Sequence, residues 1–271
     1  MTVDEWLAAL SAELRRRQVD PSGPVGEAAV HLRDSGQAPL SVFGPPAAYA
    51  LAVVESLRGT TAAARRRPRS DVRLEARGIT KKYGRRTVLN GVDLSVHAGE
   101  VVAMIGANGC GKSTMLRICA GLTRPSSGEV RIHGRVGYCP QAGGTSDYLT
   151  ADEHFVLVGA GRGVPRTAAR AEGRARAAAL DWPHVARDGQ ARHLSGGTRQ
   201  KLNLVLGGLG DPDVLLLDEP YQGFDNGTYL DFWQQVWRWR DAGSAIVVVT
   251  HLLGELDRVD TVLDLTPRGE R

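Results

Sequence analysis

The chain has 271 residues, of which 42% are hydrophobic and 24% are charged, and its formal net charge is +4 at pH 7. These values are typical of a soluble globular protein, and the small basic excess does not by itself argue for nucleic-acid binding. The length allows one α/β domain of about 200 residues and a smaller additional unit.

Three further observations bear on where the protein works. No apolar run approaches the ~20 residues of a membrane-spanning helix. The segment Met1–Trp6 carries acidic residues where a signal peptide needs basic ones. The cysteines, Cys110, Cys119 and Cys139, lack metal-ligand spacing and favour a reducing compartment. We therefore expect a cytoplasmic protein.

Residues 1–60 predict a small helical module. Thr2 and Glu5 fit a capping box, and Trp6 begins an apolar stripe with helical spacing. Proline and glycine divide the rest into two further helical segments, the last of which begins after Pro46. Because a module of this size buries little surface, we expect it to pack on the main domain or on a partner.

An arginine-rich linker is predicted over residues 61–71. We interpret it, like the arginines near residues 15–17 and 162–176, as a solvated segment, and proximity to an anionic membrane surface is the alternative. The linker separates the helical module from a β-rich remainder that begins at Val72.

Residues 72–271 predict one α/β domain. Two segments with alternating apolar residues, 72–76 and 88–96, suit an antiparallel β layer. An Ala- and Arg-rich stretch of helical pattern, about 142–192, predicts a helical subdomain. Short continuous apolar runs are typical of parallel strands buried on both faces. These runs are Val101–Ile105, Val214–Leu217 and Ala245–Val249.

A phosphate-binding loop is predicted directly after Ile105. The sequence from Gly106 to Ser113 has the form G-x-x-x-x-G-K-[ST] between a strand and a helix-compatible segment. Its glycines let backbone N–H groups turn towards phosphate oxygens, Lys112 reaches the β- and γ-phosphates, and Ser113 can ligate Mg²⁺. We therefore predict nucleoside triphosphate binding. The binding residues are Gly106, Ala107, Asn108, Gly109, Cys110, Gly111, Lys112, Ser113 and Thr114.

A second motif is the buried run that ends in Asp218 and Glu219. Asp218, at the carboxyl edge of a strand, is placed to hold Mg²⁺, and Glu219 can polarise the water that attacks the γ-phosphate. Buried strands avoid unpaired charge at their ends, which favours a functional role for this pair. A third motif, Leu194 to Gln200, opens a helix with a serine and two glycines. By itself it predicts only a capped helix start that can face an anion.

Together these motifs resemble the nucleotide-binding subunit of ATP-binding-cassette (ABC) transporters, over about residues 72–265. The resemblance implies an α/β P-loop NTPase fold of the ABC type, with a mixed parallel sheet core, an antiparallel β layer and a helical subdomain. It also implies ATP and Mg²⁺ as ligands and ATP hydrolysis as the activity. The passage Phe43–Ala50 loosely resembles small helical HAAS-type modules found beside bacterial membrane proteins, and an unrelated helical extension is the alternative.

The resemblance also implies roles for single residues. Tyr83 matches the aromatic that stacks on adenine, and Gln141 matches the glutamine that touches Mg²⁺ and the attacking water. The implied catalytic residues are Glu219, His251, Gln141 and Lys112, and the implied metal ligands are Ser113, Gln141 and Asp218. The implied contacts across a dimer interface, at the nucleotide of a second subunit, are Ser195, Gly196, Gly197 and Asp225.

Some of these assignments have structural alternatives, and the chain departs from the family pattern in places. The alternatives are a surface aromatic for Tyr83, a solvated loop residue for Gln141 and a strand-end histidine for His251. Tyr221 and Phe224 stand where a small hydroxyl residue and leucine are more usual. None of these departures removes a group that does chemistry.

The predicted function is that of an ATP-binding and hydrolysing subunit of an ABC transporter, with export favoured over import. Because no membrane-spanning segment is predicted, the expected partners are a separate transmembrane permease and a second ATPase subunit, identical or different. The expected location is the inner face of the cell membrane, and no nucleic acid is expected. The alternatives are a soluble ABC ATPase that acts on ribosomes or nucleic acid, and a nucleotide-sensing protein without hydrolysis.

Overall fold

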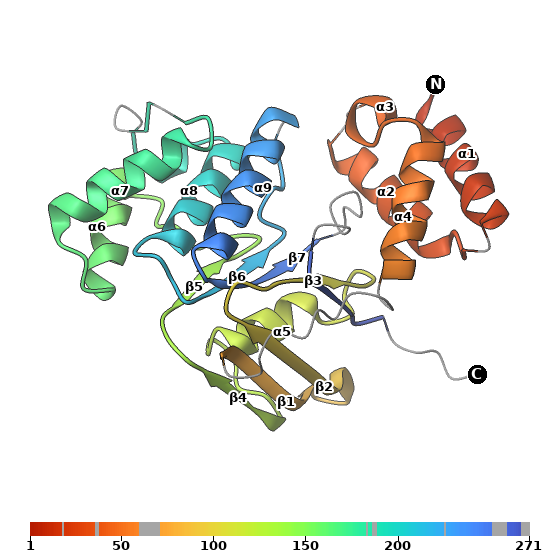
Figure 1. The fold of residues 1–271 in the computed structure, drawn as a ribbon. Coiled ribbons are helices and arrows are strands. Elements are labelled where there is room, and N and C mark those ends of the chain that lie inside the picture. The colour runs from red at the N-terminus through yellow and green to blue at the C-terminus, as the bar shows by residue number, and fades with distance from the viewer. Residues whose placement is uncertain are drawn as a thin grey trace.

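The computed structural model describes residues 1–17, 19–35, 38–59, 71–182, 184–185, 189–224, 226–250 and 259–266. In Figure 1 the helices at the start of the chain lie at the right, most of the later helices lie at the left, and the two β-sheets lie between and below them. The N-terminal helices are α1 (Val3–Arg16), α2 (Ser22–Ser35), α3 (Pro39–Val42) and α4 (Pro46–Gly59).

The N-terminal helices enclose an aromatic cluster. Helix α1 begins with the predicted capping box, in which Thr2 accepts from the Glu5 N–H and Glu5 accepts from the Thr2 N–H. Trp6 is fully buried, stacks on Phe43 at 5.2 Å between ring centroids, and donates from Nε1 to the Gly44 carbonyl at 2.8 Å. These residues belong to the same apolar cluster as the core of the larger sheet, so the helices pack on the main domain. The sequence predicted three helical segments here, and it missed the single turn of α3.

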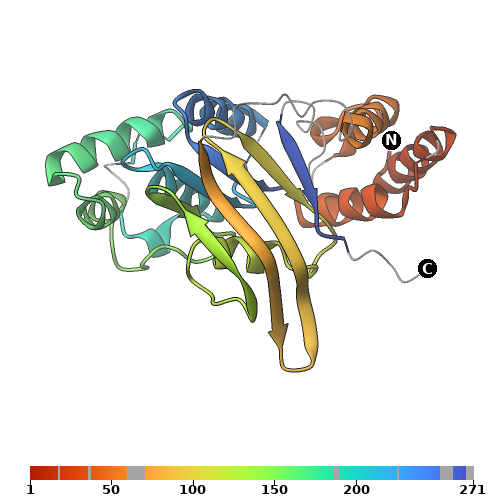
Figure 2. The same cartoon turned by 60° about the horizontal axis from the view of Figure 1, so that its bottom comes forward.

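The antiparallel layer predicted from alternation is confirmed. It contains β1 (Val72–Tyr83), β2 (Arg86–His97) and β4 (Ser127–Ile132), in the order β2-β1-β4. Both neighbouring pairs are antiparallel, and β1 and β2 form the long hairpin in the foreground of Figure 2. The alternation was read only as far as Ala76, whereas β1 continues to Tyr83. This continuation brings the hairpin turn beside the phosphate-binding loop.

The second sheet has five parallel strands in the order β5-β6-β7-β3-β8. Its strands are β3 (Val101–Ile105), β5 (Val136–Cys139), β6 (Val214–Asp218), β7 (Ala245–Val249) and β8 (Thr261–Asp264). All residues of β6 and β7 are buried, which explains their continuous apolar sequences. The three predicted runs are confirmed as strands. Because the strands are parallel, the segments that follow them meet at one edge, where such sheets bind ligands.

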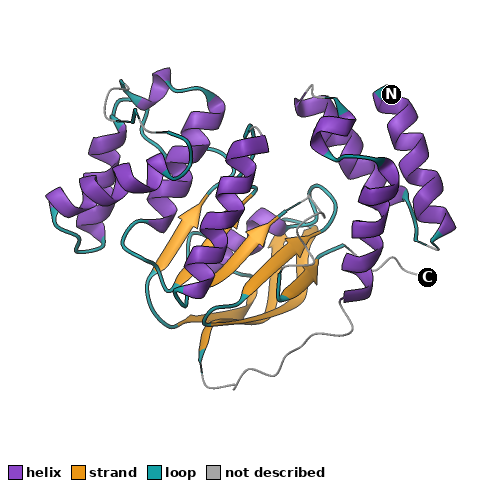
Figure 3. Ribbon diagram, turned by 45° about the horizontal axis from the view of Figure 1, so that its top comes forward, coloured by secondary structure: helices purple, strands orange, loops and turns teal. Residues whose placement is uncertain are grey.

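The remaining helices cover this sheet or extend beyond it (Figure 3). They are α5 (Lys112–Cys119), α6 (Ala151–Gly161), α7 (Arg166–Ala178), η1 (Ala191–His193), α8 (Gly196–Gly208) and α9 (Asn226–Asp241). Helices α6 and α7 pack closely, since a Cβ on Gly173 would lie 2.3 Å from the ring of the buried Phe155. Among the described helices, none is both long and apolar enough to cross a membrane.

Candidate nucleotide site

The loop from Gly106 to Ser113 joins β3 to α5, and its path depends on its glycines. Gly106 and Gly111 have φ of +138° and +111°, which side-chain-bearing residues rarely adopt. A Cβ on Gly111 would also lie 2.7 Å from the Leu89 side chain. No side chain caps the start of α5, an arrangement that suits a phosphate at the helix N-terminus.

Lys112 lies inside this loop. Its side chain is buried, and Nζ donates to the carbonyl oxygens of Gly106 at 2.5 Å and Ala107 at 3.2 Å. The ammonium group is therefore positioned by the loop itself, next to the helix N-terminus. Of the other predicted loop residues, Ala107, Asn108 and Gly109 are exposed, and Cys110 and Thr114 are half-buried.

Two oxygen donors meet where the loop approaches β6. Ser113 Oγ donates to Asp218 Oδ1 at 3.1 Å, and Asp218 is the last residue of β6, with 2% of its surface exposed. Hydroxyl and carboxylate oxygens are the ligands that Mg²⁺ prefers, usually together with phosphate oxygens and water. The residues present therefore fit a magnesium ion beside a bound phosphate. Burial, and to a smaller extent the negative charge of Asp218, raises the pKa of the neighbouring Tyr138 to about 12.

A second pair of polar side chains lies at the same edge of the parallel sheet, where β5 and β6 end. Gln141 follows β5, and its Nε2 donates to Glu219 Oε2 at 2.9 Å. The two residues meet because β5 and β6 are neighbours in the sheet. Glu219 has φ of +47°, a left-handed conformation that a non-glycine residue adopts at a cost of about 1 kcal/mol or more. Strain of this kind concentrates at functional sites.

The β1–β2 hairpin contributes an aromatic ring and a cation. Tyr83 is 53% exposed, and Lys81 Nζ lies 4.9 Å from the centre of its ring. Arg86 pairs with Tyr83 across the turn, and its Nη2 donates to the Gly109 carbonyl at 3.3 Å. The sequence singled out Tyr83 but missed Arg86, whose only signal was its place opposite Tyr83 across a tight turn.

Three of the predicted dimer-interface residues, Ser195, Gly196 and Gly197, lie at the start of α8. Ser195 caps this helix, because its Oγ accepts from the Thr198 N–H at 3.2 Å. Gly197 lies against the loop that follows Glu219, since a Cβ on Gly197 would be 2.6 Å from the Gly223 carbonyl oxygen. The other two predicted site residues, Asp225 and His251, lie outside the residues that the structure describes.

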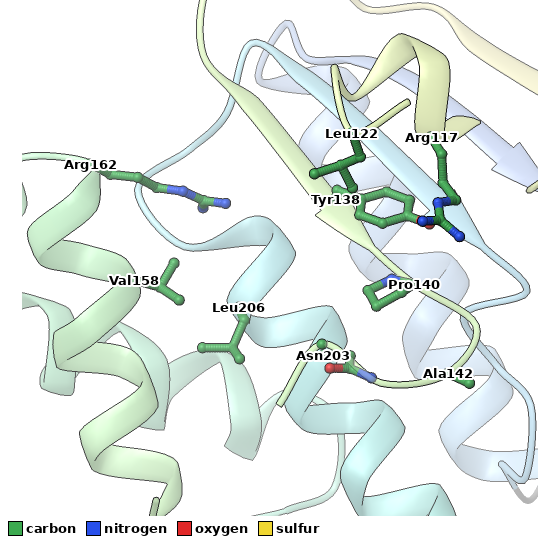
Figure 4. Close-up of a pocket in the computed structure, with 10 residues that line it drawn as sticks. Arg117, Leu122, Tyr138, Pro140, Ala142, Val158, Arg162, Asn203 and Leu206 are labelled. Carbon is green, nitrogen blue, oxygen red and sulfur yellow. The ribbon is translucent and has the colours of Figure 1, made fainter. Parts of the chain in front are cut away.

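Beside Gln141 there is a cavity of about 450 Å³ between α6, α8 and the end of α5 (Figure 4). It is lined by Arg117, Leu122, Tyr138, Pro140, Ala142, Gly144, Val158, Arg162, Asn203 and Leu206. Burial lowers the pKa of Arg162, although this guanidinium donates to the carbonyls of Gly207 and Leu209.

Two buried amides of α8 hold the segment around Gln141 in place. Gln200 Nε2 donates to the Pro140 carbonyl at 3.2 Å, and Asn203 Nδ2 donates to the Gly143 carbonyl at 2.9 Å. The sequence did not predict these contacts. The sequence feature that could have indicated them is the spacing of Gln200 and Asn203. These two amides lie three residues apart on a helix whose other buried residues are apolar or glycine.

Proteins of the ABC transporter family are similar to this chain over much of its length. A family model described as "ABC transporter" matches residues 89–222. The Nod factor export ATP-binding protein I of Burkholderia lata is 30% identical over 210 residues, which cover 73% of this chain and 69% of that protein. The aliphatic sulfonates import ATP-binding protein SsuB 1 of the same organism is 38% identical over 206 residues, which cover 69% and 60%.

A solved structure of the ATP-binding subunit of an ABC transporter has 28% sequence identity and a TM-score of 0.63, and the match covers 70% of this chain and 85% of that one. The predicted fold of the ABC type is therefore confirmed. The chain spans 65% of the length of the Nod factor export ATP-binding protein I of Ralstonia nicotianae and 12% of the mouse cholesterol transporter ABCA5.

Proposed function

Because the chain belongs to the ABC transporter family, we propose that it binds and hydrolyses ATP as the ATP-binding subunit of a transporter. The observation that carries this proposal is the meeting of two polar pairs beside the phosphate-binding loop. Ser113 bonds to Asp218, and Gln141 bonds to Glu219, at neighbouring positions on one edge of the parallel sheet. A nucleotide bound in the loop would have its terminal phosphate next to both pairs.

In this proposal each group has one task. The loop N–H groups and Lys112 bind the phosphates, and Ser113 and Asp218 would hold Mg²⁺, which when bound offsets the charge on the phosphate oxygens. Gln141 orients a water molecule in line with the γ-phosphate. Glu219 accepts a proton from that water as its oxygen bonds to phosphorus, and the bond from phosphorus to the departing ADP oxygen breaks. Tyr83 stacks on the adenine.

We further propose that two subunits close on each other, so that Ser195, Gly196 and Gly197 of one reach the nucleotide of the other. The start of α8 suits this task, because backbone N–H groups at a helix N-terminus attract an anion. The proposal also assigns Asp225 to the dimer interface and His251 to the γ-phosphate. These two assignments rest only on the resemblance to the family. Whether the two subunits are identical is an outcome of the test below.

The proposed partner is a separate transmembrane protein that docks at the cavity beside Gln141, on the inner face of the cell membrane. Support comes from the amides of Gln200 and Asn203, which tie the cavity wall to the segment that carries Gln141. Movement of the partner would thereby be transmitted to the pair Gln141 and Glu219.

In this proposal the chain comprises a helical module of residues 1–60, a linker of residues 61–71 and the ATPase domain of residues 72–271.

We propose export as the direction of transport, on the basis of the Nod factor export relatives. Import is the second candidate, because a sulfonate import relative is 38% identical. An exporter and an importer take up the transported compound from opposite sides of the membrane. In liposomes that hold the complete transporter, a compound added on the ATP side would stimulate hydrolysis by an exporter, and one added on the opposite side would stimulate an importer.

The proposal is tested on the purified chain by measuring ATP hydrolysis and oligomeric state. The wild type, with Mg²⁺ and ATP, should release phosphate. Lys112→Ala should weaken ATP binding about 10- to 100-fold, as expected for the loss of a charged hydrogen-bond donor. Glu219→Gln should bind ATP, fail to hydrolyse it and persist as an ATP-bound dimer. Glu129→Gln, at an exposed carboxylate on β4, is the matched control and should behave as the wild type.

A wild-type protein that neither binds ATP nor gains binding with a candidate partner would overturn the proposed function. A Glu219→Gln protein that hydrolyses ATP at the wild-type rate would overturn only the assignment of the base. Dimerisation of the purified chain alone would indicate a homodimer, and hydrolysis only after addition of a different cassette would indicate a heterodimer.

A further inference from the structure

Two loops that begin at neighbouring strand ends are joined by a buried hydrogen bond. In the sheet, Asp218 of β6 pairs with Val249 of β7, so the residues that follow each strand start side by side. Tyr221 lies two residues past Glu219, and Thr250 follows Val249 directly. The hydroxyl groups of Tyr221 and Thr250 are 2.5 Å apart, and the side chains are 8% and 0% exposed.

Each partner in this bond is fixed from another side. The Tyr221 ring meets Tyr229 edge-on at 5.4 Å and lies 5.7 Å from Phe232, so helix α9 holds it. The Thr250 N–H donates to the Met104 carbonyl of β3 at 3.3 Å, two residues before Gly106. A continuous set of contacts therefore runs from the loop after Glu219, through Tyr221 and Thr250, to the strand that carries the phosphate-binding loop.

We propose that Tyr221 is a positioning residue for the reaction: its bond to Thr250 fixes the Glu219 loop relative to the end of β7. The inference rests on the proposed function, in which Glu219 activates water at the γ-phosphate. The Glu219 backbone is strained, with φ of +47°, so its loop needs an external constraint to keep the carboxylate directed. The Tyr221 side chain reaches from this loop to the residue that follows β7, and its hydroxyl bonds to that of Thr250.

Such a bond matters for the rate because catalytic groups must be held close to their reactive geometry. A misplacement of about 1 Å can lower a rate roughly 100-fold, even when its cause lies away from the reacting atoms. The contacts given above for Tyr221 are with Thr250 and helix α9 and not with the phosphate-binding loop, so we expect nucleotide affinity to be insensitive to its hydroxyl. The inference therefore predicts a change in kcat without a matching change in KM or in Kd for ATP.

The test uses the full chain and removes one hydroxyl at a time, in Tyr221→Phe, Thr250→Val and the double variant. Each single variant should lower kcat at least about tenfold while KM and Kd for ATP stay within about twofold of the wild type. The double variant should be no slower than the slower single variant, because both changes remove the same bond. Melting temperatures show how far each variant is destabilised.

The matched control is Ser244→Ala, at the opposite end of β7. Ser244, the residue before β7, is also buried, and its Oγ donates to the Pro212 carbonyl at 2.8 Å, so this variant too loses one buried hydrogen bond. It should lower the melting temperature without lowering kcat. If the Tyr221 and Thr250 variants lose stability but keep wild-type kcat, or if their effects multiply in the double variant, the inference is wrong. Wild-type protein that neither binds ATP nor hydrolyses it, alone or with a partner cassette, would instead overturn the proposed function, and this inference with it.

Discussion

The Gln141 amide and the Glu219 carboxylate lie 2.9 Å apart, although 78 residues separate them in the chain. The amide nitrogen donates to Oε2, so Gln141 restrains the carboxylate before any water or phosphate is bound. Gln141 is in turn bracketed by hydrogen bonds from α8 to Pro140 and Gly143. The proposed base is thus connected through one amide to the wall of the cavity in Figure 4.

From this connection we predict that Gln141→Ala lowers kcat about 10- to 100-fold and leaves ATP affinity within about threefold, because the base loses its restraint and the water its orientation. The measurement is phosphate release at saturating ATP, with nucleotide binding followed separately. Gln190→Ala, which removes an amide from the segment before η1, is the control. Equal losses of kcat and affinity would mean that Gln141 supports the fold of the site instead of the reaction.

Arg86 is predicted to contribute to nucleotide affinity. Its guanidinium contacts the Gly109 carbonyl at the tip of the loop and would lie near bound phosphates, but the site is exposed and solvent screens the charge. Arg86→Ala should therefore raise the Kd for ATP only about fivefold, and the difference should shrink as salt is added. Titration with a fluorescent ATP analogue would measure it. The control is Arg85→Ala, at the adjacent exposed arginine in the hairpin turn, which should bind ATP with the wild-type Kd. If both variants raise the Kd equally, the effect comes from the net positive charge of the hairpin and not from the contact of Arg86 with the loop.

The three thiols are predicted to differ in reactivity. Burial raises the pKa of Cys119 to about 12 and raises that of Cys139 further, so both stay protonated and shielded at pH 8. Cys110 is partly exposed in the phosphate-binding loop. We expect iodoacetamide to modify Cys110 first and ATP to slow that reaction, as read by peptide mass spectrometry. Cys110→Ala should take up no label until the protein is unfolded, and rapid labelling of Cys119 in the native protein would contradict the prediction.

Trp6 is predicted to hold the N-terminal helices together. Trp6→Ala removes a fully buried indole, its stacking on Phe43 and its bond to Gly44, at a cost of about 3–5 kcal/mol. Because so small a helical unit has little stability of its own, amide hydrogen exchange should rise throughout α1 and α4. Exchange in β6 and β7 should stay slow. Loss of protection across the whole chain would instead mean that these helices and the ATPase domain unfold as one unit.

Much of the fold and part of the site could be predicted from the sequence, because the relevant signals are local. A glycine-rich turn with lysine and serine between a strand and a helix is a well-understood phosphate-binding loop, so this loop was recognisable. The pair Asp218 and Glu219 was recognisable because two carboxylates follow a buried apolar run. The continuous apolar runs of β3, β6 and β7 indicated strands buried on both faces.

The tertiary structure alone decided which of these elements are neighbours. Strand order in a parallel sheet depends on how helices pack across it, and the apolar pattern of a strand does not encode its partner. For that reason the bond from Tyr221 to Thr250, the contact of Arg86 with the loop and the amides of α8 were not predicted. The sequence determined which groups this protein has for phosphate chemistry, and the order of its strands determined which of them meet.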